Sequence, residues 1–265
     1  MMRLDLLVLQ KGLTASRLRA KALILNGQIQ VNGVICTKPA KLTEETAELV
    51  RIGADLRYVG RGGLKLEAVL KQQQLSLKGC TCMDIGASTG GFTDCMLQYG
   101  AERVYAVDVG HGQLAEPLRQ DARVICMEGT DIRTLQREAV PDCIDFLSVD
   151  VSFISLERIL PDICRFLSEN GTAVLLIKPQ FEAGRTDVGK NGIVRSKAVH
   201  VRVLQTVCMA LERYGLHIQM LCPSPIRGGS GNAEYLVLVK RGKEIQSVPF
   251  SLQFIVAQAL AADKK

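Results

Sequence analysis

The chain lacks the features of several common protein classes. Its 265 residues contain no run of about eighteen apolar residues, so we expect no membrane-spanning helix. Residues 1–5 show no apolar stretch behind a basic start, which predicts no secretion signal and a cytoplasmic protein. The nine cysteines form no C-x-x-C pair and no cluster with histidine, a pattern typical of reduced core residues rather than of a metal site.

Two common nucleotide-binding motifs are also missing from residues 82–92, which read C-M-D-I-G-A-S-T-G-G-F. Ser88 stands where the dinucleotide motif G-x-G-x-x-G needs its second glycine, and no lysine follows the glycines as a phosphate loop requires. The stretch still reads as a buried strand, a glycine-rich turn and a helix start, whose free amides favour an anion or a carboxylate. An acidic residue two positions before the first glycine, here Asp84, is common in S-adenosylmethionine sites, so we predict a cofactor cradle.

The composition, 47% hydrophobic and 23% charged, allows one domain of ordinary size and a smaller second one. We expect the small domain at residues 1–53, a glycine-rich linker at 54–63 and the large domain at 64–245. Residues 246–265 predict a tail with one helix over 252–262. The net charge of +6 permits nucleic-acid binding but does not prove it.

The small domain has the pattern of two helices followed by a β-hairpin. Apolar residues predict a short first helix and a second helix over 17–24, with Leu18, Ala22 and Leu25 on its apolar face. An Asn-Gly pair between alternating residues predicts the hairpin turn, and a closing strand follows it. The small domain is therefore expected to be α+β.

From residue 81 onward, strand-like apolar runs alternate with helical patterns. This alternation predicts an α/β fold, a Rossmann-like, mostly parallel sheet with helices on both faces. The last two runs, at 216–221 and 235–239, follow each other without a helix, and we expect them to pair antiparallel at one edge. Ligands bind such sheets at the carboxyl ends of the strands, where the strand order reverses.

Polar residues stand at those strand ends. Asp108 follows Asp84 by 24 residues, near the spacing at which an acidic residue meets ribose hydroxyls, and Asp131 is placed to reach an adenine amino group. Lys178 follows four apolar residues, where a lysine is poorly solvated unless an acidic group meets it. Four residues form either a catalytic set or two structural salt bridges: Lys65, Asp150, Lys178 and Glu234.

Longer motifs surround these residues. They are R-G-G-L-K-L at 61–66, D-I-G-A-S-T-G-G-F at 84–92, V-D-V-G-H-G-Q-L at 107–114, D-V-S-F-I-S at 150–155, K-P-Q-F-E at 178–182 and G-N-A-E-Y-L at 231–236. The small domain carries R-L-D at 3–5, S-R at 16–17, Lys21 and G-Q-I-Q-V-N-G at 27–33. The large domain resembles the FtsJ-like class of RNA ribose 2′-O-methyltransferases, and the small one resembles the RNA-binding module named after ribosomal protein S-four. Together they resemble the TlyA family of ribosomal RNA methyltransferases, often labelled haemolysins.

The resemblance implies a class I methyltransferase sheet that methylates a ribose 2′-hydroxyl of ribosomal RNA and uses S-adenosyl-L-methionine. Cytidine in small-subunit (16S) RNA is the implied target, with large-subunit (23S) RNA as a second one. The implied partner is ribosomal RNA or a ribosomal subunit, with neither a membrane nor a metal. Lys178 would act as the base, oriented by Asp150, with Lys65 near the nascent oxyanion and Glu234 holding a lysine. If Lys178 stays charged, it orients and stabilises the oxygen instead.

The expected binding residues form two groups. The cofactor group is Asp84, Gly86, Ala87, Ser88, Thr89, Gly90, Gly91, Phe92, Asp108, Val109, Asp131 and Asp150. The RNA group is Arg3, Ser16, Arg17 and Lys21. A basic helix without an aromatic platform suits phosphate and shape contacts better than base stacking, although basic residues can also form a merely solvated face.

Three other functions stay open. An NAD-dependent reductase would use the same sheet and Asp108, but its G-x-G-x-x-G motif is missing. A membrane-lytic, haemolysin-like protein would have only the helix near residues 250–262, whose apolar core is too short to insert alone. An RNA-binding protein without catalysis is disfavoured because all four residues of the catalytic set are present.

Overall fold

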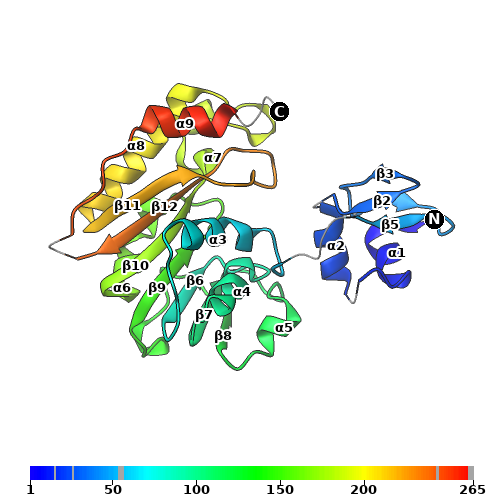
Figure 1. Cartoon of the computed structure of the whole chain (residues 1–265), viewed down its shortest axis with the longest axis horizontal. Helices are drawn as coiled ribbons and strands as arrows, with labels where there is room; N and C mark the ends of the chain where they lie inside the picture. Colours follow the sequence, from blue (N-terminus) through cyan, green and yellow to red (C-terminus); the bar gives the residue numbers. More distant parts are fainter. Residues whose placement is uncertain (15, 26, 53–56, 243–244, 262–265) are drawn as a thin grey trace. The chain divides into compact units, whose positions relative to one another are not determined.

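The structure, a computed structural model, describes residues 1–14, 16–25, 27–52, 57–242 and 245–261. It divides into two units, Met1–Arg61 and Gly62–Lys265, whose elements are labelled in Figure 1. Residues 54–56 of the expected linker and 262–265 of the expected tail lie outside the described residues.

The first unit combines two helices with short antiparallel strands. Its elements are β1 (Met2–Arg3), α1 (Leu4–Gln10), α2 (Arg17–Leu25), β2 (Ile29–Val31), β3 (Val34–Ile35), β4 (Leu42–Thr43) and β5 (Leu49–Arg51). The predicted hairpin is confirmed, because β2 pairs antiparallel with β3 through a turn at Asn32 and Gly33. Both turn residues have positive φ, +50° and +78°, which asparagine and glycine tolerate. Strand β5 pairs with β2 on its other side, and β1 pairs with β4.

The apolar face predicted for α2 is wrong. Ala20, Leu23 and Ile24 are buried in the core of this unit, whereas Leu25 is 56% exposed. The side chains of the other two expected members lie outside what the structure describes. The sequence of α2 offers two apolar stripes on opposite faces of the helix, and packing against α1 selects the one that contains Ala20.

The second unit is built on a seven-stranded sheet. Its strands are β6 (Thr81–Ile85), β7 (Arg103–Asp108), β8 (Val124–Glu128), β9 (Ile144–Val149), β10 (Leu167–Ile177), β11 (Leu216–Pro223) and β12 (Tyr235–Arg241). They lie in the order β11-β12-β10-β9-β6-β7-β8. Strands β6 to β10 pair in parallel, and β12 is antiparallel to both of its neighbours, as predicted for the last two runs. The order reverses between β6 and β9, the place where such sheets bind ligands.

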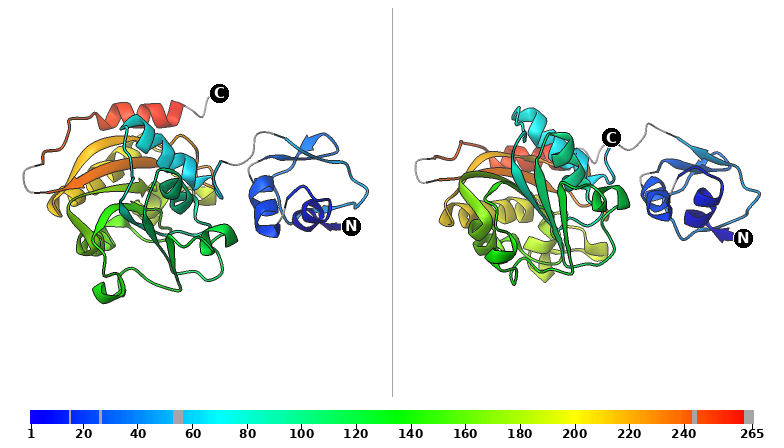
Figure 2. Two further views of the ribbon diagram at one scale, coloured as in Figure 1. Left: turned by 60° about the horizontal axis from the view of Figure 1, so that its bottom comes forward. Right: turned by 90° about the horizontal axis from the view of Figure 1, so that it is seen from below.

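Helices cover both faces of this sheet, with α3 and α4 on one face and α8 on the other (Figure 2). The helices are α3 (Gly62–Gln72), α4 (Gly91–Gln98), α5 (Glu116–Arg119), α6 (Leu160–Phe166), α7 (Pro179–Glu182), α8 (Lys197–Arg213) and α9 (Leu252–Ala261). The helix expected in the tail is confirmed as α9. It buries Ile255, Val256 and Ala259 in the same apolar core as α6 and α8, so this segment is part of the unit.

Gly62 and Gly63 correct the expected linker, because they begin α3 instead of preceding it. A Cβ atom added at Gly62 would lie 3.4 Å from the ring of Phe92 on α4. Because 3.4 Å is an ordinary van der Waals distance, the start of α3 is within contact range of α4, and the two glycines belong to a packed helix rather than to a flexible connection.

Candidate active site

The predicted cradle is the connection from β6 to α4. Gly86 and Gly90 have φ of +84° and +92°, in the left-handed region. A Cβ atom at Gly86 would lie only 2.5 Å from the carbonyl oxygen of Asp150, so a side chain does not fit there. Ser88 also has positive φ, +49°, and is exposed in the turn. The turn thus lies directly against the end of β9, where the strand order reverses.

Asp84 lies at the end of β6 as expected, and its direct contact with a cofactor remains a prediction. It is fully buried, and its carboxylate accepts hydrogen bonds from Thr93 Oγ1 at 2.6 Å and Ser148 Oγ at 2.8 Å. Burial raises the pKa of Asp84 to about 6. Its place is beneath the turn, where it connects β6 to the first turn of α4 and to β9.

Asp108 lies beside the turn. Its Oδ2 accepts the backbone N–H of Ser88 and its Oδ1 that of Gly110, both at 2.7 Å. The next residue, Val109, has a side chain that is 69% exposed. Asp131 forms an ion pair with Arg133, which lowers the pKa of Asp131. The structure therefore brings Asp108 to the cradle, whereas Asp131 is engaged by a neighbouring arginine.

Glu128, at the end of β8, was missed by sequence reasoning. Its carboxylate accepts the backbone N–H groups of Gly112, Gln113 and Leu114 at 2.7–2.8 Å and pairs with Arg119 at 2.8 Å. The amide of Leu114, followed by Arg119, lowers the pKa of Glu128 to about 2. Glu128 thus fixes the loop that follows Asp108, a role that a lone glutamate in a sequence does not reveal.

The four residues of the catalytic set form two ion pairs. Lys178 Nζ lies 2.6 Å from Asp150 Oδ1 and donates to Ser152 Oγ at 2.9 Å. Lys65 Nζ lies 2.6 Å from Glu234 Oε2, and these two side chains are only 9% and 3% exposed. Each buried charge therefore has a partner, without which its burial would be costly. The lysine that Glu234 holds is Lys65.

The architecture brings both pairs to one edge of the sheet. Strands β10 and β12 run antiparallel in a register that pairs Ile177 with Tyr235, so Lys178 directly follows β10 at the end of the sheet where Glu234 directly precedes β12. Gly62 lies one turn before Lys65 on α3, and a Cβ atom added there would lie 4.0 Å from Asp150 Oδ2. The two salt bridges lie at the carboxyl edge of the sheet, next to the glycine turn, and a catalytic role for them remains a prediction.

Phe153 is a second residue that sequence reasoning left without a role. Its side chain is 90% exposed and its φ is +65°, a left-handed conformation that is an outlier for an aromatic residue. The ring lies against Phe181, with a centroid distance of 5.0 Å. Phe153 follows Asp150 by three residues, so a solvent-facing aromatic ring stands beside the Lys178–Asp150 ion pair. The D-V-S-F motif at residues 150–153 was the available signal.

In the first unit, the structure brings Arg3 and Arg17 together through Asp5. The Asp5 carboxylate is fully buried and accepts from both arginines at 3.0–3.1 Å, while the arginine side chains remain 41% and 46% exposed. Arg3, and then Arg17, lowers the pKa of Asp5. The two guanidinium groups are thus held in fixed positions at the surface.

Ser16 and Lys21 differ from these arginines. The Ser16 hydroxyl accepts the backbone N–H of Arg19 at 3.2 Å, as an N-cap does at a helix start, so the structure gives Ser16 a capping role. Lys21 lies on α2, one turn after Arg17, and is half-buried. A contact of Lys21 with RNA therefore remains a prediction.

Family comparisons agree with this architecture. The model described as FtsJ-like methyltransferase matches residues 58–241, and the S4 domain model matches residues 2–48. The second unit is therefore a methyltransferase domain, and the first is an S4 domain. This assignment favours the predicted methyltransferase over the reductase alternative.

Relatives that match nearly the full length of the chain identify its group within the family. YqxC of Bacillus subtilis is 45% identical over 251 residues, which cover 93% of this chain and 89% of YqxC. The 16S/23S rRNA (cytidine-2′-O)-methyltransferase TlyA of Mycobacterium tuberculosis is 38% identical over 90% of this chain and 89% of TlyA. A solved structure from Streptococcus thermophilus, of a protein that carries a hemolysin label, is 45% identical, covers 99% of this chain and 97% of its own, and has a TM-score of 0.80. This chain belongs to the FtsJ-like methyltransferase family and, within it, to the TlyA group.

Within the residues that the structure describes, no helix combines the length and the apolar character needed to cross a bilayer.

Proposed function

We propose that this protein transfers a methyl group from S-adenosylmethionine to a ribose 2′-hydroxyl of ribosomal RNA. The observation that carries the proposal is the Lys178–Asp150 ion pair, which lies at the carboxyl edge of the sheet beside the glycine turn. Membership in the TlyA group supports the same chemistry.

The residues of the turn fit the proposed cofactor. The backbone of Gly86 and Gly90 leaves no room for side chains, and the start of α4 follows directly. Asp108 already accepts two amides, but each carboxylate oxygen can accept a further hydrogen bond, such as one from a ribose hydroxyl. When bound, S-adenosylmethionine supplies a methyl group that is already activated on a sulfonium. Asp84 supports this turn from beneath.

Lys178 is the residue that we assign to the reacting hydroxyl. Asp150 and Ser152 hold its ammonium group within 2.9 Å, and its side chain is only 11% exposed. In such a poorly solvated place a fixed charge acts strongly on a developing negative oxygen. Lys178 therefore orients the hydroxyl. As a neutral amine it takes the hydroxyl proton and becomes an ammonium group, whereas as an ammonium group it stabilises the oxygen while the proton leaves to solvent. Lys65, fixed by Glu234, adds a second positive charge at the same edge.

The substrate class follows from the relatives. Because TlyA is named for cytidine in 16S and 23S ribosomal RNA, we extend these targets to this chain and place its activity in the cytoplasm, where ribosomes lie. The S4 domain supplies RNA affinity through Arg3 and Arg17, and the methyltransferase domain supplies the chemistry. Exposed Phe153 suits stacking on an unstacked base.

The test is to incubate the purified protein with ribosomal subunits and S-adenosylmethionine and to map 2′-O-methyl groups on both RNAs. We expect new 2′-O-methylcytidine, and the same positions should be modified in cells that carry this gene but not in cells that lack it. Methylation of a base instead of a ribose, or no transfer to either subunit, would contradict the proposal.

A further inference from the structure

Two segments meet at the reacting edge: residues 150–156, which follow β9, and residues 178–182, which follow β10. Their contacts run in sequence order: Lys178 with Asp150 and Ser152, Phe181 with Phe153, and Glu182 with Ser155 and Leu156. The first of these contacts belongs to the proposed catalytic set. The contact of Glu182 has no role in the proposed methyl transfer, although it joins the same two segments.

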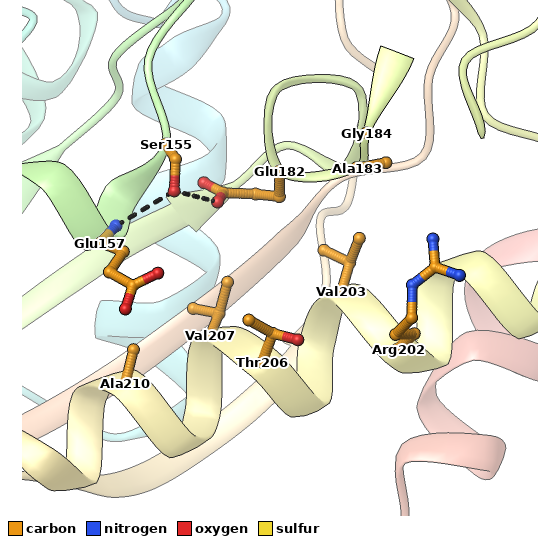
Figure 3. A pocket seen from close by; sticks show the side chains of 10 residues that line it. All are labelled: Ser155, Glu157, Glu182, Ala183, Gly184, Arg202, Val203, Thr206, Val207 and Ala210. Carbon is orange, nitrogen blue, oxygen red and sulfur yellow. Dashed lines mark hydrogen bonds between the residues drawn. The ribbon is translucent and has the colours of Figure 1, made fainter. Parts of the chain in front are cut away.

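Glu182 makes that last contact with both carboxylate oxygens. Oε2 accepts the hydroxyl of Ser155 at 2.7 Å, and Oε1 accepts the backbone N–H of Leu156 at 2.9 Å. Figure 3 shows the Glu182 and Ser155 side chains pointing toward one another at the wall of a cavity, with α8 on its other side. In the described part of the chain, none of the four residues of the catalytic set lines this cavity. Glu182 is therefore outside the set but is tied to the segment that carries Asp150.

The segment between these contacts is strained. Phe153 has φ of +65°, and a left-handed conformation of a non-glycine residue costs roughly 1–3 kcal/mol unless its surroundings hold it. The ring contact with Phe181 holds it on one side, and the Glu182 contact two residues later holds the backbone on the other. Without Glu182, the backbone is free to relax, and Asp150 and Ser152 move with it.

We infer that Glu182 is a positioning residue for methyl transfer: it fixes the 150–156 segment so that Asp150 and Ser152 hold Lys178 and Phe153 projects outward. This inference rests on the proposed function, because it concerns the rate of that reaction. A displacement of about 1 Å at a reacting group can cost on the order of 100-fold in rate. Glu182 thus acts through Lys178 and does not need to contact either substrate.

The first experiment compares Glu182→Ala, Glu182→Gln and Ser155→Ala with wild type in single-turnover methylation of ribosomal RNA. We expect a loss of about 10- to 100-fold for Glu182→Ala, with unchanged affinity for S-adenosylmethionine. Glu182→Gln keeps an acceptor for the Leu156 amide and should recover much of the rate, and Ser155→Ala should lose only a few-fold. Glu157→Ala is the matched control, since Glu157 lines the same cavity but has a 51% exposed side chain paired with Arg213.

A second experiment reports the position of the segment directly. The chain contains no tryptophan, so Phe153→Trp introduces a single tryptophan, which can be excited selectively in the presence of the five tyrosines. We expect its anisotropy to fall when it is combined with Glu182→Ala and to stay unchanged with Glu157→Ala. A loss of rate with cofactor affinity and anisotropy both unchanged would show that Glu182 does not position the segment.

The outcomes separate the two claims. If wild type and Glu157→Ala transfer no methyl group to RNA, the proposed function is wrong. If they are active and Glu182→Ala is folded and equally fast, only the inference about Glu182 is wrong. Should Glu182→Ala fail to fold, a full rate in Ser155→Ala together with an unchanged anisotropy when it is combined with Phe153→Trp would overturn the inference.

Discussion

The two units of this protein arrange opposite charges in opposite ways. In the S4 domain the acid is buried, and its two arginines are left 41% and 46% exposed. In the methyltransferase domain the lysines themselves are withdrawn from solvent, with 9% and 11% of their side chains exposed. Exposed arginines fixed by a buried acid suit phosphate contacts, whereas poorly solvated lysines suit work on a single proton or oxygen. The burial of the cation, rather than the presence of an ion pair, distinguishes the two functions.

The largest effect expected from this comparison is on Lys178. Lys178→Ala should lower methyl transfer by about 10²–10⁴-fold, because the group that acts on the reacting hydroxyl is lost. Affinity for S-adenosylmethionine by calorimetry and the melting temperature should stay close to wild type. Lys71→Ala is the control, since Lys71 pairs with Glu67 but is 57% exposed. Substantial turnover by Lys178→Ala would show that the reaction does not need this buried lysine, and the functional difference that we draw between buried and exposed cations would be wrong.

The next effect concerns the cradle. Asp108→Ala should weaken cofactor binding by about 10- to 100-fold, because charge-assisted hydrogen bonds are each worth roughly 1.5–3 kcal/mol. Asp121→Ala removes an aspartate that is paired with Arg123 and lies outside the turn, so it should leave cofactor affinity unchanged. Equal affinities in calorimetry for Asp108→Ala and wild type would mean that the cofactor lies elsewhere.

A smaller effect is expected in the S4 domain. Changing Arg17 and Lys21 together to alanine should weaken RNA binding and flatten its logarithmic dependence on salt by up to about two units, one for each lost phosphate contact. Cofactor affinity should not change. Lys38 and Lys41, both exposed in the same unit, provide the matched double substitution. An equal loss of slope in that control would show that the whole surface contributes, and not the α2 helix.

The smallest effect is also the most discriminating. Asp5→Asn removes a negative charge, which by itself should strengthen RNA binding, but it also releases Arg3 and Arg17 from their fixed positions. We expect a few-fold weaker binding by titration at constant salt, because orientation outweighs one unit of net charge. Tighter binding would mean that Asp5 serves stability alone and that the arginines need no fixed geometry.

The sequence predicted the elements better than the contacts between them. Apolar runs and an Asn-Gly pair were sufficient for the sheet, the hairpin and the order of the motifs, because these patterns are local. The apolar face of α2 was mispredicted because two stripes compete and only packing against α1 decides between them. Gly62 and Gly63 resembled a linker because glycine marks both flexible connections and close helix contacts.

The same holds for the candidate site, where positions along the chain were predictable but contacts between distant residues were not. The ends of the parallel strands predicted where Asp108, Asp150 and Lys178 would gather, since the edge of a sheet is a consequence of topology. The roles of Glu128 and Glu182 could not be predicted. Each carboxylate accepts backbone N–H groups that lie many residues away, and every non-proline residue has such a group, so the sequence does not indicate which ones are contacted. The position of Asp84 at a strand end predicted a contact with the cofactor. The hydrogen bonds that its buried carboxylate accepts from Thr93 and Ser148 could not be predicted, because these two residues belong to other elements.

The place of β12 in the sheet bears on the time at which the enzyme becomes active. It is the last strand along the chain, yet it lies between β10 and β11 rather than at an edge. Lys65 on α3 obtains its partner from the residue just before this strand, 169 positions later. During synthesis, therefore, the S4 domain emerges while the methyltransferase domain still lacks an interior strand and Lys65 still lacks its partner. The proposed catalytic set is complete only after residue 234 has been synthesised.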